Sequence, residues 1–414
     1  MKLSKRLRRI LFFLAIIGPG IITATAGNDA GGTATYSIVG AHFGYNLLWL
    51  LILTTFILVI VQEMCARMGA VTGKGLSDLI REEFGIRWTF IAMSILLVAN
   101  IAVTISEFAG IAASMEIFGI SKYISVPIVA FFIWYLIVRG SFKGVERVFL
   151  VVCLIYISYI FSGFLAKPDW LQAFKHTVIP TVKLEPEYIR IMIALVGTTI
   201  TPWMQFFLQS NIVEKGISLK QYRYQRLDTI FGSISAGIVA FFIIVACSAT
   251  LHKAGIEITS AREAGLALKP LAGNFAAYLF ALGFFGASTL GASILPLSSS
   301  YAMCEAFGFE NGISKRFSEA PIFYSLYTAL ILVGVAVVLF PRIPLIFVML
   351  LAQEINGILL PFILIFMIIL VNDKRIMGEH VNSKWYNFIV WSTAVLLIAL
   401  TLILISLPLL SRFF

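Results

Sequence analysis

The sequence predicts an all-helical protein that crosses a membrane many times, and two observations support this fold class. The 414 residues are 60% hydrophobic and only 13% charged, with a mean hydropathy of +0.96, whereas soluble proteins carry about 25% charged residues. Apolar stretches of about 20 residues recur along the whole chain, and each is long enough to span a bilayer as an α-helix. Strands of a membrane barrel would be about 10 residues long and would alternate in polarity.

Eleven spans can be placed, with no soluble domain or low-complexity tract between them. We therefore expect residues 1–414 to form a single transmembrane domain, with short surface helices in the longest loops, near 166–187 and 251–274. A cleaved signal peptide with an Ala-x-Ala site at Ala24 and Ala26 is the alternative for the first span, but the span count favours an uncleaved helix. The expected spans cover about residues 10–43 (broken), 46–68, 88–117, 123–138, 145–165, 188–213 (broken), 229–250, 275–305, 320–340, 344–371 and 385–408.

The basic residues indicate the orientation of the chain. Of the 31 Lys and Arg residues, 21 fall in the N-terminal segment and in alternate loops, so we expect those segments in the cytoplasm and the C-terminus outside. The net charge of +10 is spread over short loops between spans, which makes it a topology signal and gives no indication of nucleic-acid binding. The compact chain, without appended domains, is typical of a protein in a prokaryotic plasma membrane.

The sequence offers no motif for an enzyme or a bound cofactor. We find no nucleophile–base pair, metal-ligand triad or phosphate-binding loop. The four Cys residues lie in or beside apolar runs without a CxxC pair, and the four His residues fall at span ends or in loops. We therefore expect no enzymatic activity, no cofactor and no obligatory protein partner apart from the surrounding lipid bilayer.

The first span is interrupted by helix breakers around a single acid. Its sequence, IIGPGIITATAGNDAGGTATY, places Asp29 among glycines. A break frees backbone carbonyls, which must line a cavity or bind something. A carboxylate near the middle of the membrane is costly and functional by default, and its natural partner is a cation. The other interpretation of Asp29 is that it caps the half-helix that follows.

The sixth span carries a matching interruption. Its sequence, IMIALVGTTITPWMQFFLQSN, contains Gly197 and Pro202, and it should break near Thr201. The two broken spans head two five-span blocks, about 10–165 and 188–371, and an odd number of spans inverts the second block relative to the first. Two broken helices at corresponding positions of inverted halves indicate the midplane site of a secondary transporter. The span at about 385–408 is additional.

Seven strings spread over nearly the whole chain are informative when they are taken together. They are GPG at 18–20, DAGG at 29–32, QEMCARMGAVTGKGLSDLIREEFG from 62, SEFAG at 106–110, FKGVERV at 142–148, AQEINGILLPF at 352–362 and NDKRIMGE at 372–379. In this combination the chain resembles the NRAMP family of divalent-metal transporters. The resemblance implies a leucine-transporter-type fold with a metal site between the two breaks. It matches Asp29 to the family's metal-binding aspartate and Gln353 to a glutamine of span 10.

Departures from the family pattern change the expected chemistry. The family's metal-binding Asn is Gly32 here, its Met with a metal-binding thioether is Thr201, and the Ala three residues earlier is Thr198. Loss of a soft thioether removes a preference for Mn²⁺ or Fe²⁺ over hard ions, and a roomier pocket suits a partly hydrated Mg²⁺. We therefore expect the magnesium-transporting branch of the family. The predicted cation site comprises Asp29, Ala26, Gly32, Thr198, Thr201, Gln205, Gln209 and Gln353, with the freed backbone carbonyls.

The expected mechanism is uncoupled Mg²⁺ uptake driven by the membrane potential. The family's proton route includes a His after the Met-Pro pair, here Trp203, and an acid three residues before Glu107, here Thr104. The first alternative is a proton-coupled Mn²⁺/Fe²⁺ transporter, in which Met204 would replace the missing thioether. The second is an amino-acid permease on the same fold, which an acid beside the break disfavours because it would repel a substrate carboxylate.

Each polar residue of the predicted site also has a structural interpretation. The hydroxyls of Thr198 and Thr201 could bond back to a helix carbonyl, and Gln353 could bond between helices. Glu107 suits either a role in ion passage or a buried structural acid. We expect Trp203 and the two Phe residues near it to serve packing or lipid contact, and Glu63 to pair with Arg67.

Overall fold

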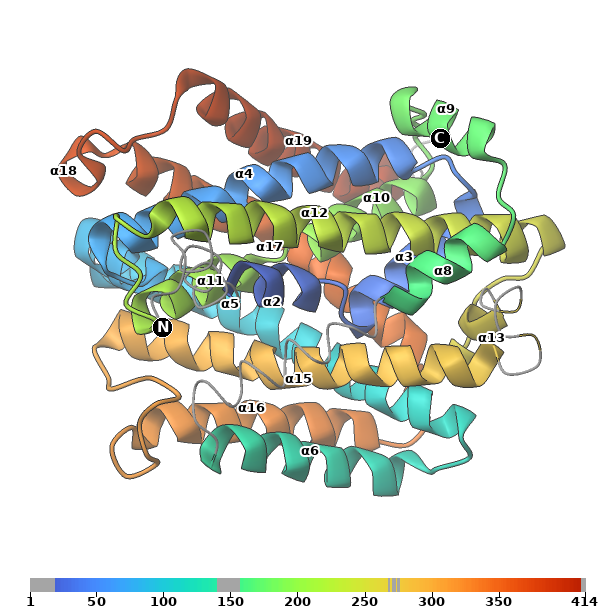
Figure 1. Ribbon diagram of the computed structural model, residues 1–414, viewed down its shortest axis with the longest axis horizontal. Helices are drawn as coiled ribbons and strands as arrows, with labels where there is room; N and C mark the ends of the chain where they lie inside the picture. Colours follow the sequence, from blue (N-terminus) through green and yellow to red (C-terminus); the bar gives the residue numbers. More distant parts are fainter. Residues whose placement is uncertain (1–18, 140–156, 267–268, 270–272, 274–275, 411–414) are drawn as a thin grey trace, which may run out of the picture.

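The computed structural model describes residues 19–139, 157–266, 269, 273 and 276–410, and Figure 1 shows long helices that run roughly side by side. No strand occurs in these residues, so the predicted all-helical fold is confirmed. The helices in chain order are α2 (Pro19–Ala26), α3 (Ala30–Phe43), α4 (Leu48–Thr72), α5 (Leu76–Ile117), α6 (Lys122–Arg139), α8 (Ile157–Leu165), α9 (Trp170–Val178), α10 (Pro186–Thr199), α11 (Pro202–Glu214), α12 (Tyr222–Cys247) with a π-helical turn η2 (Ser248–His252), α13 (Ala261–Gly265), α15 (Ala276–Phe307), α16 (Pro321–Leu339), α17 (Leu345–Asn372), α18 (Lys374–Met377) and α19 (Lys384–Leu410).

The described helices account for the expected spans. Nine segments are long and apolar enough to cross a membrane, with α10 and α11 counted as one. The first expected span appears as α2 and α3, and its beginning lies outside the described residues, as does the first half of the fifth span before α8. The surface helices expected in the longest loops are present as α9 and α13.

The third span agrees with its expected position. Helix α5 extends from Leu76 to Ile117, but it joins two helices across a kink at Gly85, whose backbone is non-helical (φ 74°, ψ 174°). The expected start at residue 88 falls just after this kink. The helical segment at 76–84 before the kink carries charged side chains such as Arg81 and Glu82, which hydropathy leaves out of a span.

The two broken helices lie at the centre of the bundle. The membrane-length window of the α10–α11 segment is 100% buried, whereas those of α6, α16 and α19 are only 33%, 39% and 28% buried. Figure 1 shows α2 and α11 between α12 on one side and α15 on the other, in agreement with their contacts. Polar residues of the two breaks are therefore surrounded by protein, where irregular backbone is tolerated in a membrane.

Glycines let the broken helices approach their neighbours backbone to backbone. A Cβ on Gly232 of α12 would lie 2.6 Å from the carbonyl oxygen of Gly20 in α2. A Cβ on Gly197 of α10 would lie 2.2 Å from the carbonyl oxygen of Gln353 in α17. Small residues at such crossings are typical of helix packing in membranes, and here they hold each half-helix tightly on a long helix.

The bundle has two ends, which are named here after the glycines that follow α3 and α4. The Gly44 end carries the loops 44–47, 118–121 and 340–344, and the Gly73 end carries the loops 73–75, 215–221 and 308–320. They lie at the right and left of Figure 1 respectively. Helices α4, α10, α11 and α17 all run from the Gly44 end towards the Gly73 end.

Candidate functional site

The first break consists of Gly27, Asn28 and Asp29, between the end of α2 and the start of α3. The N-terminus of α3 is capped by Asp29, whose Oδ1 accepts a hydrogen bond of 2.6 Å from the Gly32 N–H. The other carboxylate oxygen, Oδ2, is buried and has no hydrogen-bond partner among the described residues. Capping therefore explains only one of the two oxygens, and a buried carboxylate oxygen left unpaired is costly unless a cation or water meets it.

A second carboxyl group, that of Glu107 on α5, lies beside Asp29. Its Oε2 accepts a hydrogen bond from the Ala30 N–H at 3.1 Å, and the two carboxyl groups interact directly. Gly291 of α15 leaves room for it, since a Cβ there would lie 2.3 Å from Oε2. Two buried carboxyl groups this close cannot both stay ionised without a cation nearby. This contact favours a role of Glu107 in the cation site.

The second break lies at Ile200 and Thr201, between α10 and α11, as the sequence predicted. Thr201 stands at the N-cap of α11 without using its side chain as a cap. Neither the Thr198 nor the Thr201 hydroxyl bonds back to a helix carbonyl, although Thr198 also lies close to the Tyr36 hydroxyl. Thr199, in contrast, bonds back to the Leu195 carbonyl at 2.7 Å. The back-bonded interpretation thus applies to Thr199, and the two hydroxyls named in the predicted site remain available.

The two breaks face each other across Gly32. A Cβ on Gly32 would lie 3.0 Å from the Thr198 Oγ1, 3.2 Å from Asp29 Oδ1 and 2.7 Å from the Gly27 carbonyl oxygen. Gln353 approaches the same break from α17, because a Cβ on Gly31 would lie 1.9 Å from its Nε2. The structure therefore brings Asp29, Gly32, Thr198 and Gln353 together.

The three glutamines of the predicted site differ in their surroundings. Gln205 is fully buried, and neither its Oε1 nor its Nε2 has a partner among the described residues. Gln353 accepts a hydrogen bond from Asn356 at 3.0 Å and leaves its Nε2 unpaired. Gln209 donates to the Lys74 carbonyl at 2.9 Å, so it lies towards the Gly73 end, apart from the set at the breaks.

Ala26 is the last residue of α2, and Thr199 is the last of α10. The final carbonyls of a helix have no intrahelical partner, and this end of the helix carries partial negative charge. Both C-terminal ends stop at the breaks and favour a cation there. The side chain of Ala26 is buried and apolar, so only its carbonyl could act as a ligand.

Two residues outside the predicted site also approach it. The Met204 methyl group lies 2.0 Å from where a Cβ on Gly27 would be, and its sulfur 3.6 Å. Gln62 of α4 has both amide atoms buried and unpaired among the described residues. Gln62 lies two turns before Gly69, which packs on Gln209, and therefore on the same face of α4. Its position inside an apolar run of α4 is the sequence signal that could have singled it out.

The neighbouring residues follow the structural interpretations. Trp203, Phe206 and Phe207 are buried in the interior, so they serve packing and not lipid contact. Asn28 points away from the site and donates to the Ala236 carbonyl at 3.1 Å. Glu63 and Arg67 form the expected ion pair at 3.4 Å, and Tyr222 also bonds to Glu63.

Two inverted five-helix blocks, each headed by a broken helix with its break at the centre, define a secondary transporter fold of the leucine-transporter type. The chain belongs to the family described as Natural resistance-associated macrophage protein-like, Nramp, whose sequence profile matches residues 20–407. A Bacillus subtilis (strain 168) relative named divalent metal cation transporter MntH is 26% identical over 97% of this chain and 94% of its own length. A Clostridium acetobutylicum relative with the same name is 26% identical over 97% of this chain and 92% of its own length.

Solved structures agree on the fold. The crystal structure of the Eremococcus coleocola manganese transporter has a TM-score of 0.79 at 20% identity and covers 98% of this chain and 88% of its own. Mhp1, a nucleobase-cation-symport-1 family transporter, has a TM-score of 0.61 at 14% identity. The match covers 96% of this chain and 93% of the Mhp1 chain. At such identities the likeness establishes architecture, and the substrate must be argued from this chain's own residues.

The variant Asp29→Asn separates the two roles of that side chain. Asparagine caps a helix as well as aspartate does, so we expect the folding stability to change by less than about 1 kcal/mol. The loss of charge should abolish cation binding. In a thermal-unfolding titration, millimolar Mg²⁺ or Mn²⁺ should raise the Tm of the parent protein and leave that of the variant unchanged.

Asp169→Asn is the matched control for this titration. Asp169 caps the surface helix α9 through the Gln172 N–H at 3.0 Å, so the same chemical change occurs at a helix cap far from the breaks. The control should keep the parent's metal-dependent rise in Tm. An equal rise in Asp29→Asn would place the bound cation elsewhere.

Proposed function

We propose that the protein imports divalent metal cations across a cell membrane and that Mg²⁺, carried with part of its hydration shell, is its principal substrate. The observation on which this proposal rests is the unpaired Oδ2 of Asp29, buried between the ends of two broken helices. The relatives named MntH are divalent metal cation transporters, which supports the class of substrate. The choice of Mg²⁺ depends on the ligand set.

The ligand set at the breaks is hard. Its oxygen and amide groups that make no regular hydrogen bond within the described residues are one carboxylate oxygen each of Asp29 and Glu107, the Thr198 and Thr201 hydroxyls and the Gln205 amide. No group of three or more His, Cys, Asp or Glu among the described residues is arranged to hold a metal ion. Mg²⁺ binds through one or two carboxylates and keeps several waters, and hydroxyl and amide groups can accept hydrogen bonds from those waters. Gly32 contributes no ligand of its own.

The proposed mechanism is potential-driven uniport with alternating access. A dication that moves towards a negative interior gains about 4.6 kcal/mol per 100 mV, twice the value for a single charge. Trp203 and Thr104 stand where the family's proton route has titratable groups, and the Thr104 hydroxyl bonds to the Asn100 carbonyl at 2.7 Å. These observations favour transport without a coupled proton.

We further propose that the chain acts as one transport unit in the plasma membrane. Its repeats would be about 10–165 and 188–371, with the additional span at about 385–408. The described loops at the Gly73 end, 73–75, 215–221 and 308–320, carry five Lys and Arg, and those at the Gly44 end, 44–47, 118–121 and 340–344, carry one. The Gly73 end would therefore face the cytoplasm and the Gly44 end the outside.

A second candidate is proton-coupled transport of Mn²⁺ or Fe²⁺, and the position of Met204 favours it. Its thioether lies against Gly27 in the first break, where a soft sulfur ligand would prefer Mn²⁺ or Fe²⁺ to Mg²⁺. In the Mg²⁺ proposal this side chain only packs against the break.

The experiment that tests the proposed function is Mg²⁺ influx into proteoliposomes, followed with a lumenal magnesium dye. We expect influx that increases with an imposed inside-negative potential and leaves lumenal pH unchanged. External Mn²⁺ should compete only at concentrations comparable to those of Mg²⁺. Lumenal acidification, or block by micromolar Mn²⁺, would support the second candidate instead.

Met204→Leu distinguishes the two candidates within the site, because leucine preserves volume and removes the sulfur. We expect unchanged Mg²⁺ influx and an unchanged Mn²⁺ inhibition constant. Met367→Leu, at a buried position of α17, is the control for the same change elsewhere. A loss of Mn²⁺ competition of about tenfold or more, equivalent to about 1.4 kcal/mol of binding, confined to Met204→Leu, would identify the thioether as a ligand.

A further inference from the structure

A cavity of about 580 Å³ lies at the Gly44 end, between α3, α10, α17 and the loop before α13. Its walls are largely apolar, with Ile38, Ile191 and Phe347 among them, and its charged groups include Glu187, Arg190 and Glu354. Charged groups in a cavity with apolar walls act on one another and on ions more strongly than they would in open water. The affinity of this cavity for ions is therefore determined mainly by its few charged side chains.

Arg190 of α10 and Glu354 of α17 form a forked ion pair across this cavity. The Arg190 Nη2 lies 2.9 Å and 3.2 Å from the two Glu354 oxygens, and its Nε lies 3.3 Å from Oε2. The two partners differ in exposure, since the Glu354 side chain is 8% exposed and the Arg190 side chain 42%. Arg190 can leave the pair for water at little cost, but Glu354 cannot remain buried without a positive partner.

The pair lies on the two helices that also reach the candidate cation site. Glu354 follows Gln353, whose amide contacts Gly31 in the first break. Arg190 lies two turns, about 10 Å, before Gly197, where α10 packs backbone to backbone on α17. The ion pair therefore stands on the Gly44 side of the site, on the same pair of helices.

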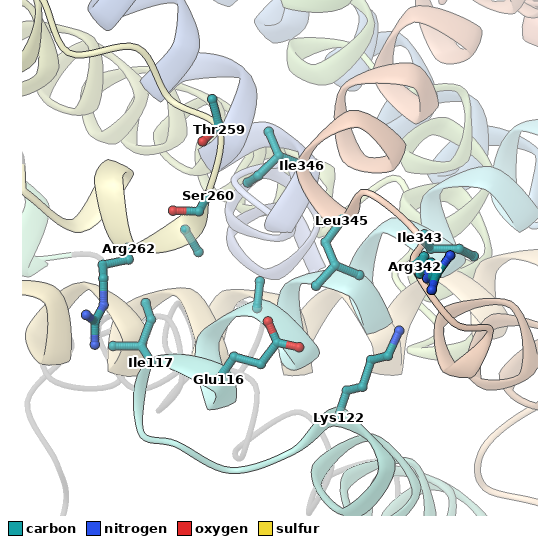
Figure 2. Close-up of a pocket in the computed structure, with 12 residues that line it drawn as sticks. Glu116, Ile117, Lys122, Thr259, Ser260, Arg262, Arg342, Ile343, Leu345 and Ile346 are labelled. Carbon is teal, nitrogen blue, oxygen red and sulfur yellow. The ribbon is translucent and has the colours of Figure 1, made fainter.

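A neighbouring cavity has the opposite charge balance. Figure 2 shows this second cavity, about 520 Å³, where Lys122, Arg262 and Arg342 outnumber Glu116. It shares Thr259 and Ile346 with the first cavity, so the two adjoin at the same end of the bundle. A dication is repelled by the basic cavity and attracted to the cavity that holds Glu187 and Glu354.

We propose that Glu354 is an outer binding carboxylate for the transported dication and that Arg190 occupies it when no ion is present. The Arg190–Glu354 pair is then an outer gate that a divalent cation opens by displacing the guanidinium, because the cation offers twice the charge to a buried carboxylate. This inference rests on the proposed function and on the Gly44 end facing outside. It adds an ion-binding step before the Asp29 site.

Single neutralisations have opposite predicted effects in proteoliposome influx assays with Mg²⁺ and, separately, Mn²⁺. Glu354→Gln removes the outer carboxylate, and we expect the KM for the transported ion to rise by about tenfold or more. Arg190→Gln removes the competing cation, and we expect KM to fall. Glu310→Gln, which removes an exposed ion pair with Lys315 at the Gly73 end, is the control and should keep the parent's KM.

The charge-swapped variant Arg190→Glu/Glu354→Arg tests whether the pair is only structural. The swap would restore a purely structural ion pair. It would not restore the proposed gate, because it places an arginine side chain next to Gln353, where the transported ion needs a carboxylate. We expect the double variant to fold, as judged by its Tm, and to transport no better than Glu354→Gln. Parent-like transport by the double variant, or a parent-like KM in Glu354→Gln, overturns the proposal.

The outcome for the parent protein separates this proposal from the function on which it rests. A parent that moves neither Mg²⁺ nor Mn²⁺ overturns the proposed function and the gate with it. A parent that moves either ion, with a swapped variant equally active, overturns the gate alone.

Discussion

The carboxylate of Asp29 imposes the constraint on which the rest of the site depends. It is fully buried, and its two oxygens have different surroundings: one caps α3 through Gly32, and the other has no partner among the described residues. The nearest acidic neighbour, Glu107, adds negative charge where α2 and α10 also present their C-terminal ends. The negative charge at the centre of this bundle therefore has to be offset, either by a bound cation or by a proton shared between the two carboxyl groups.

The surrounding helices keep this costly arrangement in place. Glycine contacts between α2 and α12, and between α10 and α17, hold both broken helices against long unbroken ones. The membrane-length part of α10 and α11 is enclosed by other helices, while most residues in the corresponding parts of α6, α16 and α19 are not buried. Conformational change in such a bundle must move half-helices relative to these contacts, and the ion pair of Arg190 and Glu354 spans one of them.

The sequence was sufficient for the architecture but not for the details of the site. Hydropathy and the two breaks predicted the helices and their centre, because a membrane allows irregular backbone only where protein encloses it. The charged helical segment at 76–84, before the Gly85 kink of α5, was not predicted, because hydropathy detects only the lipid-embedded part of a helix. Within the candidate site, the break and its charge singled out Asp29, the predicted second break lay at Thr201, and the family resemblance added Thr198; their role in cation binding stays a prediction. The different surroundings of Gln205 and Gln209, the contact of Met204 with Gly27 and the pairing of Glu354 with Arg190 depend on helix rotation and on contacts between distant segments.

Diffraction at the manganese absorption edge from crystals grown with Mn²⁺ would test most directly whether the two breaks form a hard cation site around Asp29. The account predicts an anomalous peak next to the Asp29 Oδ2, bonded directly or through one water, within reach of Thr198 or Thr201 and not in contact with the Met204 sulfur. A peak bonded to that sulfur would contradict the hard-ligand site, and a peak remote from Asp29 would contradict the site itself.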